Sequence, residues 1–273
     1  MILKKFANKS FVTRLISGIV LVALMLAAII PGGTVLFVAN MLISLVGVYE
    51  LYKVVGLERT LPGFTGYVAT LCYYALLFTG KTQYVTILLV VFLIVLLAQY
   101  VFMFPEYQTE QISNAIMCML YAGVLLSYIY LVRIGENGAY TVWLIFLCSW
   151  GSDTCAYAAG VAFGNHKMAP VLSPKKSVEG AVGGVVGAAV LGAVYAAVFI
   201  DKLQMNHPVM AFAIICGVGA LISMVGDLAA SAIKRNHKIK DYGNLIPGHG
   251  GIMDRFDSVI YVAPIVWMLL QIF

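Results

Sequence analysis

Residues 84–104 read YVTILLVVFLIVLLAQYVFMF and contain no charged side chain. An α-helix rises about 1.5 Å per residue, so a run of this length can cross the roughly 30 Å hydrocarbon core of a bilayer. Similar runs recur along the chain, in which 62% of residues are hydrophobic and only 11% are charged. With a mean hydropathy of +0.96, this composition argues against a soluble domain and indicates a polytopic helical membrane protein.

We expect an all-α fold with about nine transmembrane helices, because strand-like alternation of apolar and polar residues is absent from the sequence. The third and the last of the predicted spans are short. The nine spans are Leu15–Ile30, Thr34–Tyr52, Gly66–Thr79, Tyr84–Phe104, Asn114–Val132, Ala139–Phe163, Ala181–Ile200, Pro208–Ala230 and Ser258–Phe273.

The basic residues predict the orientation of these spans. With the N-terminus in the cytoplasm, most of the 17 Lys and Arg residues, Lys4 and Lys5 among them, lie on the inner side. Only Lys81, Arg133 and Lys202 then lie outside, which follows the positive-inside rule. Nine spans place the C-terminus outside.

Two cytoplasmic segments, residues 164–180 and 231–257, are long and polar. We therefore predict that residues 1–133 form a scaffold of membrane helices. Residues 134–273 are predicted to form a catalytic membrane domain that carries both segments.

The second segment, residues 231–257, reads SAIKRNHKIKDYGNLIPGHGGIMDRFD. Asp254 and Asp257 are three residues apart and on a helix would share one face. Carboxylates that converge repel one another unless a cation joins them, and hard oxygen ligands favour Mg²⁺. The turn at residues 247–251 is by itself only a bend. Between Lys240 and Arg255 it becomes a candidate phosphate cradle, in which His249 either braces the loop or touches substrate.

Three acidic residues lie inside predicted spans. A carboxylate within a bilayer costs roughly 2.5–3.5 kcal/mol even on a lenient scale, so it normally meets a partner or water. Asp153 and Asp227 could each pair with a lysine, but no basic residue interrupts their spans, which favours a functional role. Glu50 is the one charge deep within the first five spans, and we interpret it as a paired structural residue rather than one that faces a cavity.

The first polar segment ends in SPKKSVEG at residues 173–180. Ser177 resembles a helix N-cap, with Glu179 in the first turn. Lys175 and Lys176 either anchor the segment at the membrane surface or reach a phosphate. Glycines then recur in small-xxx-small spacing, which predicts close helix packing, at Gly180, Gly183, Gly184 and Gly187.

Three motifs resemble those of the phosphatidate cytidylyltransferases, also called CDP-diacylglycerol synthases. The longest is S-x-I-K-R-x4-K-D-x-G-x2-I-P-x-H-G-G-I-x-D-R-F-D at residues 231–257. The others are S-D-x-x-A-Y-x-x-G-x-x-F-G at residues 152–164 and S-P-K-K-S-x-E-G at residues 173–180. The resemblance covers the C-terminal half closely, whereas the N-terminal half agrees only in being helical and apolar.

The resemblance implies a homodimeric membrane enzyme that joins CTP to phosphatidic acid, giving CDP-diacylglycerol and diphosphate, with Mg²⁺ and with K⁺ as a possible second cation. We expect no nucleic acid partner. The residues expected to hold the metal are Asp227, Asp254, Asp257 and Asp153. The first three of these also count as catalytic, together with Lys234 and Arg235. The residues expected to bind substrate are Lys175, Lys176, Ser177, Lys240, Asp241, His249, Gly250, Gly251 and Arg255.

Two other functions fit parts of the sequence. An ion-coupled transporter would explain Asp153 and Asp227 but not the cluster at residues 231–257. A CTP-dependent polyprenol or phytol kinase would also handle a lipid and CTP, but it releases CDP instead of diphosphate. We expect a bacterial cytoplasmic membrane protein whose active site faces the cytoplasm.

Overall fold

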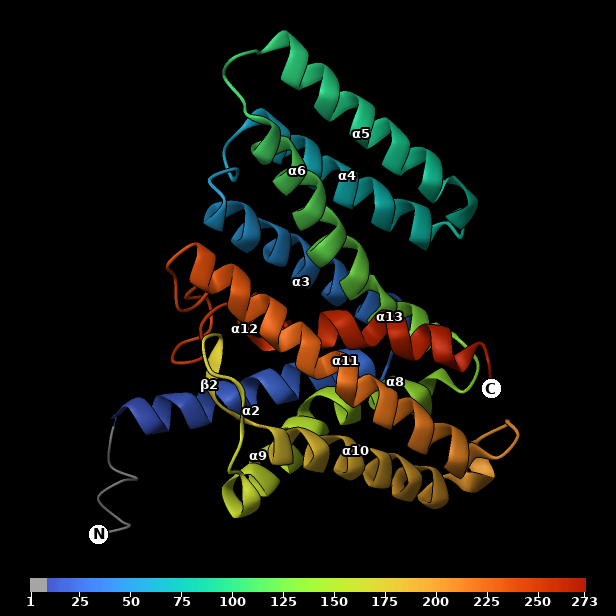
Figure 1. Ribbon diagram of the computed structural model, residues 1–273. Helices are drawn as coiled ribbons and strands as arrows, with labels where there is room; N and C mark the ends of the chain where they lie inside the picture. Colours follow the sequence, from blue (N-terminus) through green and yellow to red (C-terminus); the bar gives the residue numbers. More distant parts are fainter. Residues whose placement is uncertain (1–8) are drawn as a thin grey trace. The chain divides into compact units, whose positions relative to one another are not determined.

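The computed structural model describes residues 9–273, and most of them are helical (Figure 1). Lys4 and Lys5, which contribute to the predicted orientation, lie outside the described residues. The chain divides into two compact units. Unit 1 comprises Met1–Ser127 and Asp241–Arg255, and unit 2 comprises Tyr128–Lys240 and Phe256–Phe273.

In unit 1, α4 packs between α3 and α5, and α6 contacts all three of these helices (Figure 1). The cap of α4 shows why this helix begins at Leu61: Thr60 Oγ1 accepts a hydrogen bond from the amide of Gly63 at 3.2 Å. The helices of unit 1 are α2 (Lys9–Ile29), α3 (Gly33–Val54), α4 (Leu61–Phe78), η1 (Thr82–Tyr84), α5 (Val85–Phe102), α6 (Thr109–Cys118), the π-helical η2 (Met119–Val124) and η3 (Leu125–Ser127).

Buried hydroxyl and amide groups join the helices of unit 1. The hydroxyl of Tyr74 lies 2.6 Å from Ser44 Oγ and accepts a hydrogen bond from Asn40 Nδ2 at 3.1 Å. Asn40 also donates to the carbonyl of Leu126 at 3.0 Å. In a bilayer, polar groups between helices have no water to replace such partners, so these bonds help to hold α3, α4 and η3 together.

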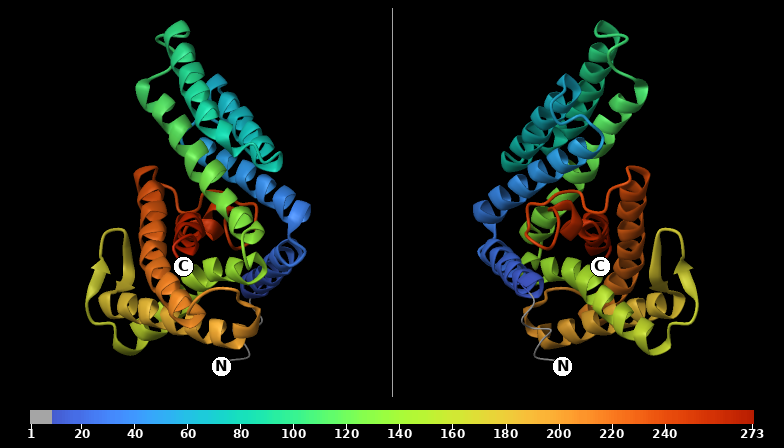
Figure 2. Two further views of the ribbon diagram at one scale, coloured as in Figure 1. Left: turned by 90° about the vertical axis from the view of Figure 1, so that its right-hand side faces the viewer. Right: turned by 90° about the vertical axis from the view of Figure 1, so that its left-hand side faces the viewer.

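Unit 2 packs its long helices α10 and α11 against each other, and α9 lies along α10. A short antiparallel hairpin that we had not predicted, β1 (Lys167–Ala169) and β2 (Ser173–Ser177), stands out from the ends of α9 and α10 (Figure 2). The helices of unit 2 are α7 (Tyr128–Ile134), α8 (Gly138–Phe146), the π-helical η4 (Leu147–Gly151), α9 (Ser152–Phe163), α10 (Val178–Val198), η5 (Ile200–Lys202), α11 (Pro208–Asn236) and α13 (Val259–Leu270). The short α12 (Met253–Phe256) lies where the chain passes from unit 1 to unit 2.

The prediction of an all-α polytopic membrane protein is confirmed. In the described part of the chain, seven helices are long and apolar enough to cross a membrane, and α13 is a shorter apolar helix. The predicted span at residues 139–163 is formed by α8, η4 and α9 in direct succession. The count of nine and the location of the two termini stay predictions. The seven helices are Val12–Ile29, Gly33–Val54, Leu61–Phe78, Thr82–Phe102, Thr109–Ile134, Val178–Val198 and Pro208–Asn236.

The first part of unit 1 ends at Ser127, and residues 241–255 group with it. The predicted domains 1–133 and 134–273 stay predictions. The roles of scaffold and catalytic domain stay predictions.

Candidate active site

Helices α9 and α10 approach closely along the predicted row of small residues. A Cβ atom built on Gly183 or Gly187 would collide with Ala159 or Cys155 of α9. The glycines therefore allow the two backbones to come together, as the small-xxx-small spacing predicted. The π-helical turn η4 ends directly before α9, whose second residue is Asp153.

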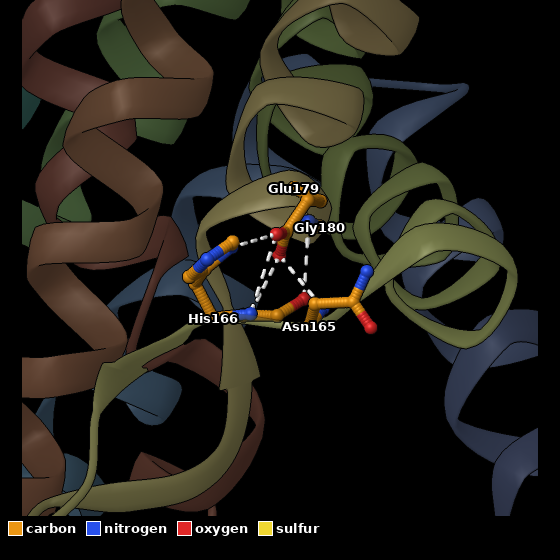
Figure 3. A network of polar contacts seen from close by, with 5 residues as sticks. Asn165, His166, Glu179 and Gly180 are labelled. Atoms are coloured by element: carbon orange, nitrogen blue, oxygen red, sulfur yellow. Dashed lines mark hydrogen bonds and ion pairs between the residues drawn. The ribbon is translucent and has the colours of Figure 1, made fainter.

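The β1–β2 hairpin is tied to the start of α10 by Glu179. The Glu179 carboxylate accepts hydrogen bonds from the backbone amides of Asn165 and His166 at 3.1–3.2 Å. The same carboxylate lies 2.5 Å from Nδ1 of the His166 ring (Figure 3). Ser177 Oγ accepts from the amide of Gly180 at 3.1 Å, which confirms Ser177 as the N-cap of α10.

A cavity of about 360 Å³ lies in unit 2 between α9, the hairpin, α10 and α11. Its charged lining consists of Asp153, Lys175 and Lys176, whereas most of the rest is apolar or small. Ser177 also lines it. Four of the predicted site residues thus face one cavity. The remaining lining residues are Ala156, Tyr157, Gly160, Val161, Met168, Ser173, Gly180, Ala181 and Met224.

The two acids inside predicted spans share a lysine. Lys176 Nζ forms an ion pair with Asp227 Oδ2, and the charges of Lys176 and Asp227 both act on the Asp153 carboxylate. No basic residue was available within either span, yet β2 supplies one from the hairpin. Lysine pairing, the alternative to a functional role, is therefore what the structure shows for Asp227, and the pair lies beside the cavity.

A second ion pair joins α11 to the turn before α13. Lys234 Nζ lies 3.9 Å from Asp257 Oδ2, and both side chains are largely buried. Helix α12 ends at Phe256, so Asp257 lies outside it and does not share a helix with Asp254. Arg235, Lys240 and Asp241 are exposed.

In unit 1, residues 241–255 fold around the buried carboxylate of Asp254. Its Oδ2 accepts hydrogen bonds from the amides of Tyr242 at 2.8 Å and Gly251 at 2.9 Å. Gly250 has φ +86°, and a Cβ there would also crowd the Asp254 carboxylate. Glycine at this position thus allows a left-handed backbone conformation and a close approach to the Asp254 carboxylate.

Helix α2 contacts the same loop. Ser17 Oγ lies 2.8 Å from Nδ1 of His249 and donates to the carbonyl of Pro247 at 2.9 Å. His249 therefore braces the loop, one of the two roles left open by the sequence. Burial and the positive charge of Arg255 hold the pKa of His249 below its ordinary value.

Carboxylates capable of holding a metal are present in both units. In the part of the chain that the structure describes, neither unit gathers three or more His, Cys, Asp or Glu side chains into one group. The metal assignments of Asp153, Asp227, Asp254 and Asp257 stay predictions.

Comparison with known proteins agrees with the motifs. A sequence profile of the Cytidylyltransferase family matches residues 12–273. The chain belongs to this family. A protein named phosphatidate cytidylyltransferase from Staphylococcus epidermidis is 30% identical over 260 residues, which cover 94% of this chain and 98% of the relative. Proteins of the same name from Staphylococcus saprophyticus and Staphylococcus aureus are 30% and 29% identical, with the same coverage.

Sequence reasoning missed two contacts in this cytidylyltransferase. Ser17 carried no signal, because one serine in an apolar run is ordinary. Glu50 carried a signal, since it is a lone charge in a membrane helix. Its carboxylate accepts hydrogen bonds from the amides of Ile252 and Met253, which agrees with its interpretation as a paired structural residue.

Proposed function

We propose that this membrane protein transfers the cytidylyl group of CTP to phosphatidic acid, giving CDP-diacylglycerol and diphosphate. The observation that carries the proposal is the cavity beside α9, where Lys175, Lys176 and Asp153 line a space with mostly apolar and small walls. Cations next to an apolar surface suit a phosphate attached to acyl chains. Membership of the Cytidylyltransferase family supports the nucleotide half of the reaction.

The reaction joins two anions. An oxygen of the lipid phosphate attacks the α-phosphorus of CTP, and a new P–O bond forms. The bond from that phosphorus to the oxygen bridging the β-phosphate breaks, and diphosphate leaves with this oxygen. Catalysis therefore depends mainly on positioning and on neutralisation of negative charge.

Lysines of the hairpin receive the lipid phosphate in this proposal. Lys176 is held by Asp227, so its ammonium is directed before substrate arrives, and exposed Lys175 lies next to it on β2. Ser177 fixes the start of α10 beside them. The residues assigned to the triphosphate and the leaving diphosphate are Lys234, Arg235, Lys240 and Arg255, with Asp241, His249, Gly250 and Gly251 in the same segment.

Carboxylates near the cavity suit a hard cation. Asp153 and Asp227 both act on one ammonium group, so this region already favours positive charge, and oxygen donors of this kind suit Mg²⁺. We assign Mg²⁺ to Asp153 and Asp227, which share Lys176. Asp254 and Asp257 stay predicted ligands. Bound Mg²⁺ would neutralise phosphate charge, and K⁺ is proposed as a second cation.

We also propose a homodimer in a bacterial cytoplasmic membrane, with the site facing the cytoplasm. The bacterial relatives and the basic residues of the two polar segments support this location.

Product analysis tests the function. Purified protein in lipid nanodiscs is incubated with cytidine-labelled CTP and phosphatidic acid, with and without EDTA. We expect a chloroform-soluble cytidine product and diphosphate in equal amounts, and loss of both in EDTA. Release of CDP with a phosphorylated lipid would instead indicate a kinase, and full activity after exhaustive chelation would contradict the metal assignment.

A further inference from the structure

Glu50 connects a membrane helix of unit 1 to the loop of the longest motif. Its Oε1 accepts a hydrogen bond from the amide of Ile252 at 3.1 Å, and its Oε2 accepts one from Met253 at 2.9 Å. The residue is only 4% exposed. The bonded residues are more than 200 positions apart in the sequence, so the N-terminal helix α3 holds a segment near the C-terminus.

The loop backbone lies directly on this carboxylate. A Cβ atom on Gly243 or Gly251 would collide with the carboxylate oxygens of Glu50. Gly251 also donates its amide to Asp254 Oδ2 at 2.9 Å. Gly251 therefore lies between two acids, one from α3 and one from the loop, and a side chain at this position would separate the loop from α3.

The cost of burying a charged carboxylate favours the observed position of the loop over others. A buried carboxylate is costly unless hydrogen bonds satisfy it, and bonds to a charged acceptor are stronger than neutral ones. If the loop moved, the two amides that donate hydrogen bonds to Glu50 would lose their acceptor. The favourable arrangement is therefore the one observed, with both oxygens on adjacent amides.

We infer that Glu50 is a positioning residue for CTP, which it does not itself touch. By fixing residues 251–253 it sets the place of the loop 241–255, which carries His249 and Arg255. The inference rests on the proposed assignment of this loop to the CTP phosphates. It gives the N-terminal helices a part in catalysis beyond that of a scaffold.

The test compares Glu50→Gln with Glu106→Gln, the same substitution at an exposed site of unit 1. Glutamine keeps the size of Glu50 but turns an NH₂ group toward one of the two amides. Hydrogen exchange of the full-length enzyme in nanodiscs should rise about tenfold in peptides covering residues 241–255. It should stay unchanged in peptides covering the hairpin, residues 165–177.

Kinetics provide the second readout. In Glu50→Gln the KM for CTP should rise about tenfold while the KM for phosphatidic acid stays constant. A structural defect alone would lower the amount of active enzyme and leave both KM values unchanged. Glu106→Gln should match the unchanged protein in exchange and in kinetics.

Each other outcome has a defined meaning. Unchanged exchange in the loop, or an equal rise in the loop and the hairpin, overturns the inference. Faster exchange in the loop with an unchanged KM for CTP also overturns the inference, because it shows that the loop does not bind CTP. The proposed transfer reaction would still stand in that case, since the variant would still form CDP-diacylglycerol. If Glu50→Gln does not fold, Glu50→Asp replaces it, because aspartate keeps the charge but is one methylene shorter, and the same KM split is expected.

Discussion

One glutamate holds each of two polar segments, the hairpin of unit 2 and the loop 241–255 of unit 1. In both, the carboxylate accepts hydrogen bonds from two adjacent backbone amides. Glu179 binds the amides of Asn165 and His166, and its side chain is 26% exposed. Glu50 binds those of Ile252 and Met253 and is 4% exposed. The same chemistry therefore occurs once near solvent, between residues 13–14 positions apart, and once in the interior between distant parts of the chain.

The difference predicts how firmly each segment is fixed. Water can replace the acceptor of the hairpin amides, so loss of Glu179 should free the hairpin locally. Water cannot easily replace Glu50, so its loss leaves buried donors without an acceptor. We expect a locally adjustable hairpin and a rigid loop. Four predictions concern these two segments and the residues they carry.

The largest effect is expected from Glu50→Ala. Two buried amides lose a charged acceptor, which should lower the free energy of unfolding by about 3 kcal/mol. Chemical unfolding of the purified protein in detergent measures this change. Glu106→Ala is the exposed control, and equal stability of the two variants would contradict the contrast.

The second-largest effect is expected from Lys176→Met, which should lower activity strongly and stability little. Methionine keeps much of the side-chain length, while the positive charge beside Asp227 and Asp153 is lost. Since removal of one charge-stabilising group from an active site costs roughly 100-fold in rate, we expect a loss of this order in kcat/KM. The control Lys202→Met, at an exposed lysine of η5, should retain full activity, and full activity of Lys176→Met would remove this lysine from the proposed site.

Glu179→Gln should act only on the hairpin. Hydrogen exchange in residues 165–177 should become faster, whereas the melting temperature should stay close to that of the unchanged protein. The exchange of residues 241–255 is the internal reference. A fall in melting temperature comparable with that of Glu50→Ala would show that the hairpin is not locally adjustable.

The smallest effect concerns pH. Burial and Arg255 hold the pKa of His249 below its ordinary value, so the unfolded chain binds a proton at this residue more readily than the folded loop does. Its contribution to stability is therefore present above about pH 6.5 and declines as pH falls through the folded pKa. Exchange of the loop should increase slightly between pH 7.5 and pH 5, and His249→Gln should weaken this dependence. An identical pH response in both proteins would rule out His249 as its source.

Local patterns predicted much of this protein. Ser177 caps α10 as its position before an apolar run indicated, and the glycines after it allow α9 and α10 to approach. The hairpin was missed because its two strands are short and polar. The contact of Glu50 with the loop was missed because its partners are backbone amides, which nearly every residue possesses. The contact of Ser17 with His249 was missed because more than 200 residues separate the two in the sequence.

Residue patterns along the chain were enough to show that it crosses a membrane, where its polar segments fall, and which family it belongs to. These properties depend on apolar runs and on motifs that can be read along the chain. The folded arrangement was needed to see that β2 supplies the lysine for Asp227 and that α3 supplies the acceptor for the loop. Such pairings follow from which surfaces meet when the helices pack, and no spacing within a single helix specifies them.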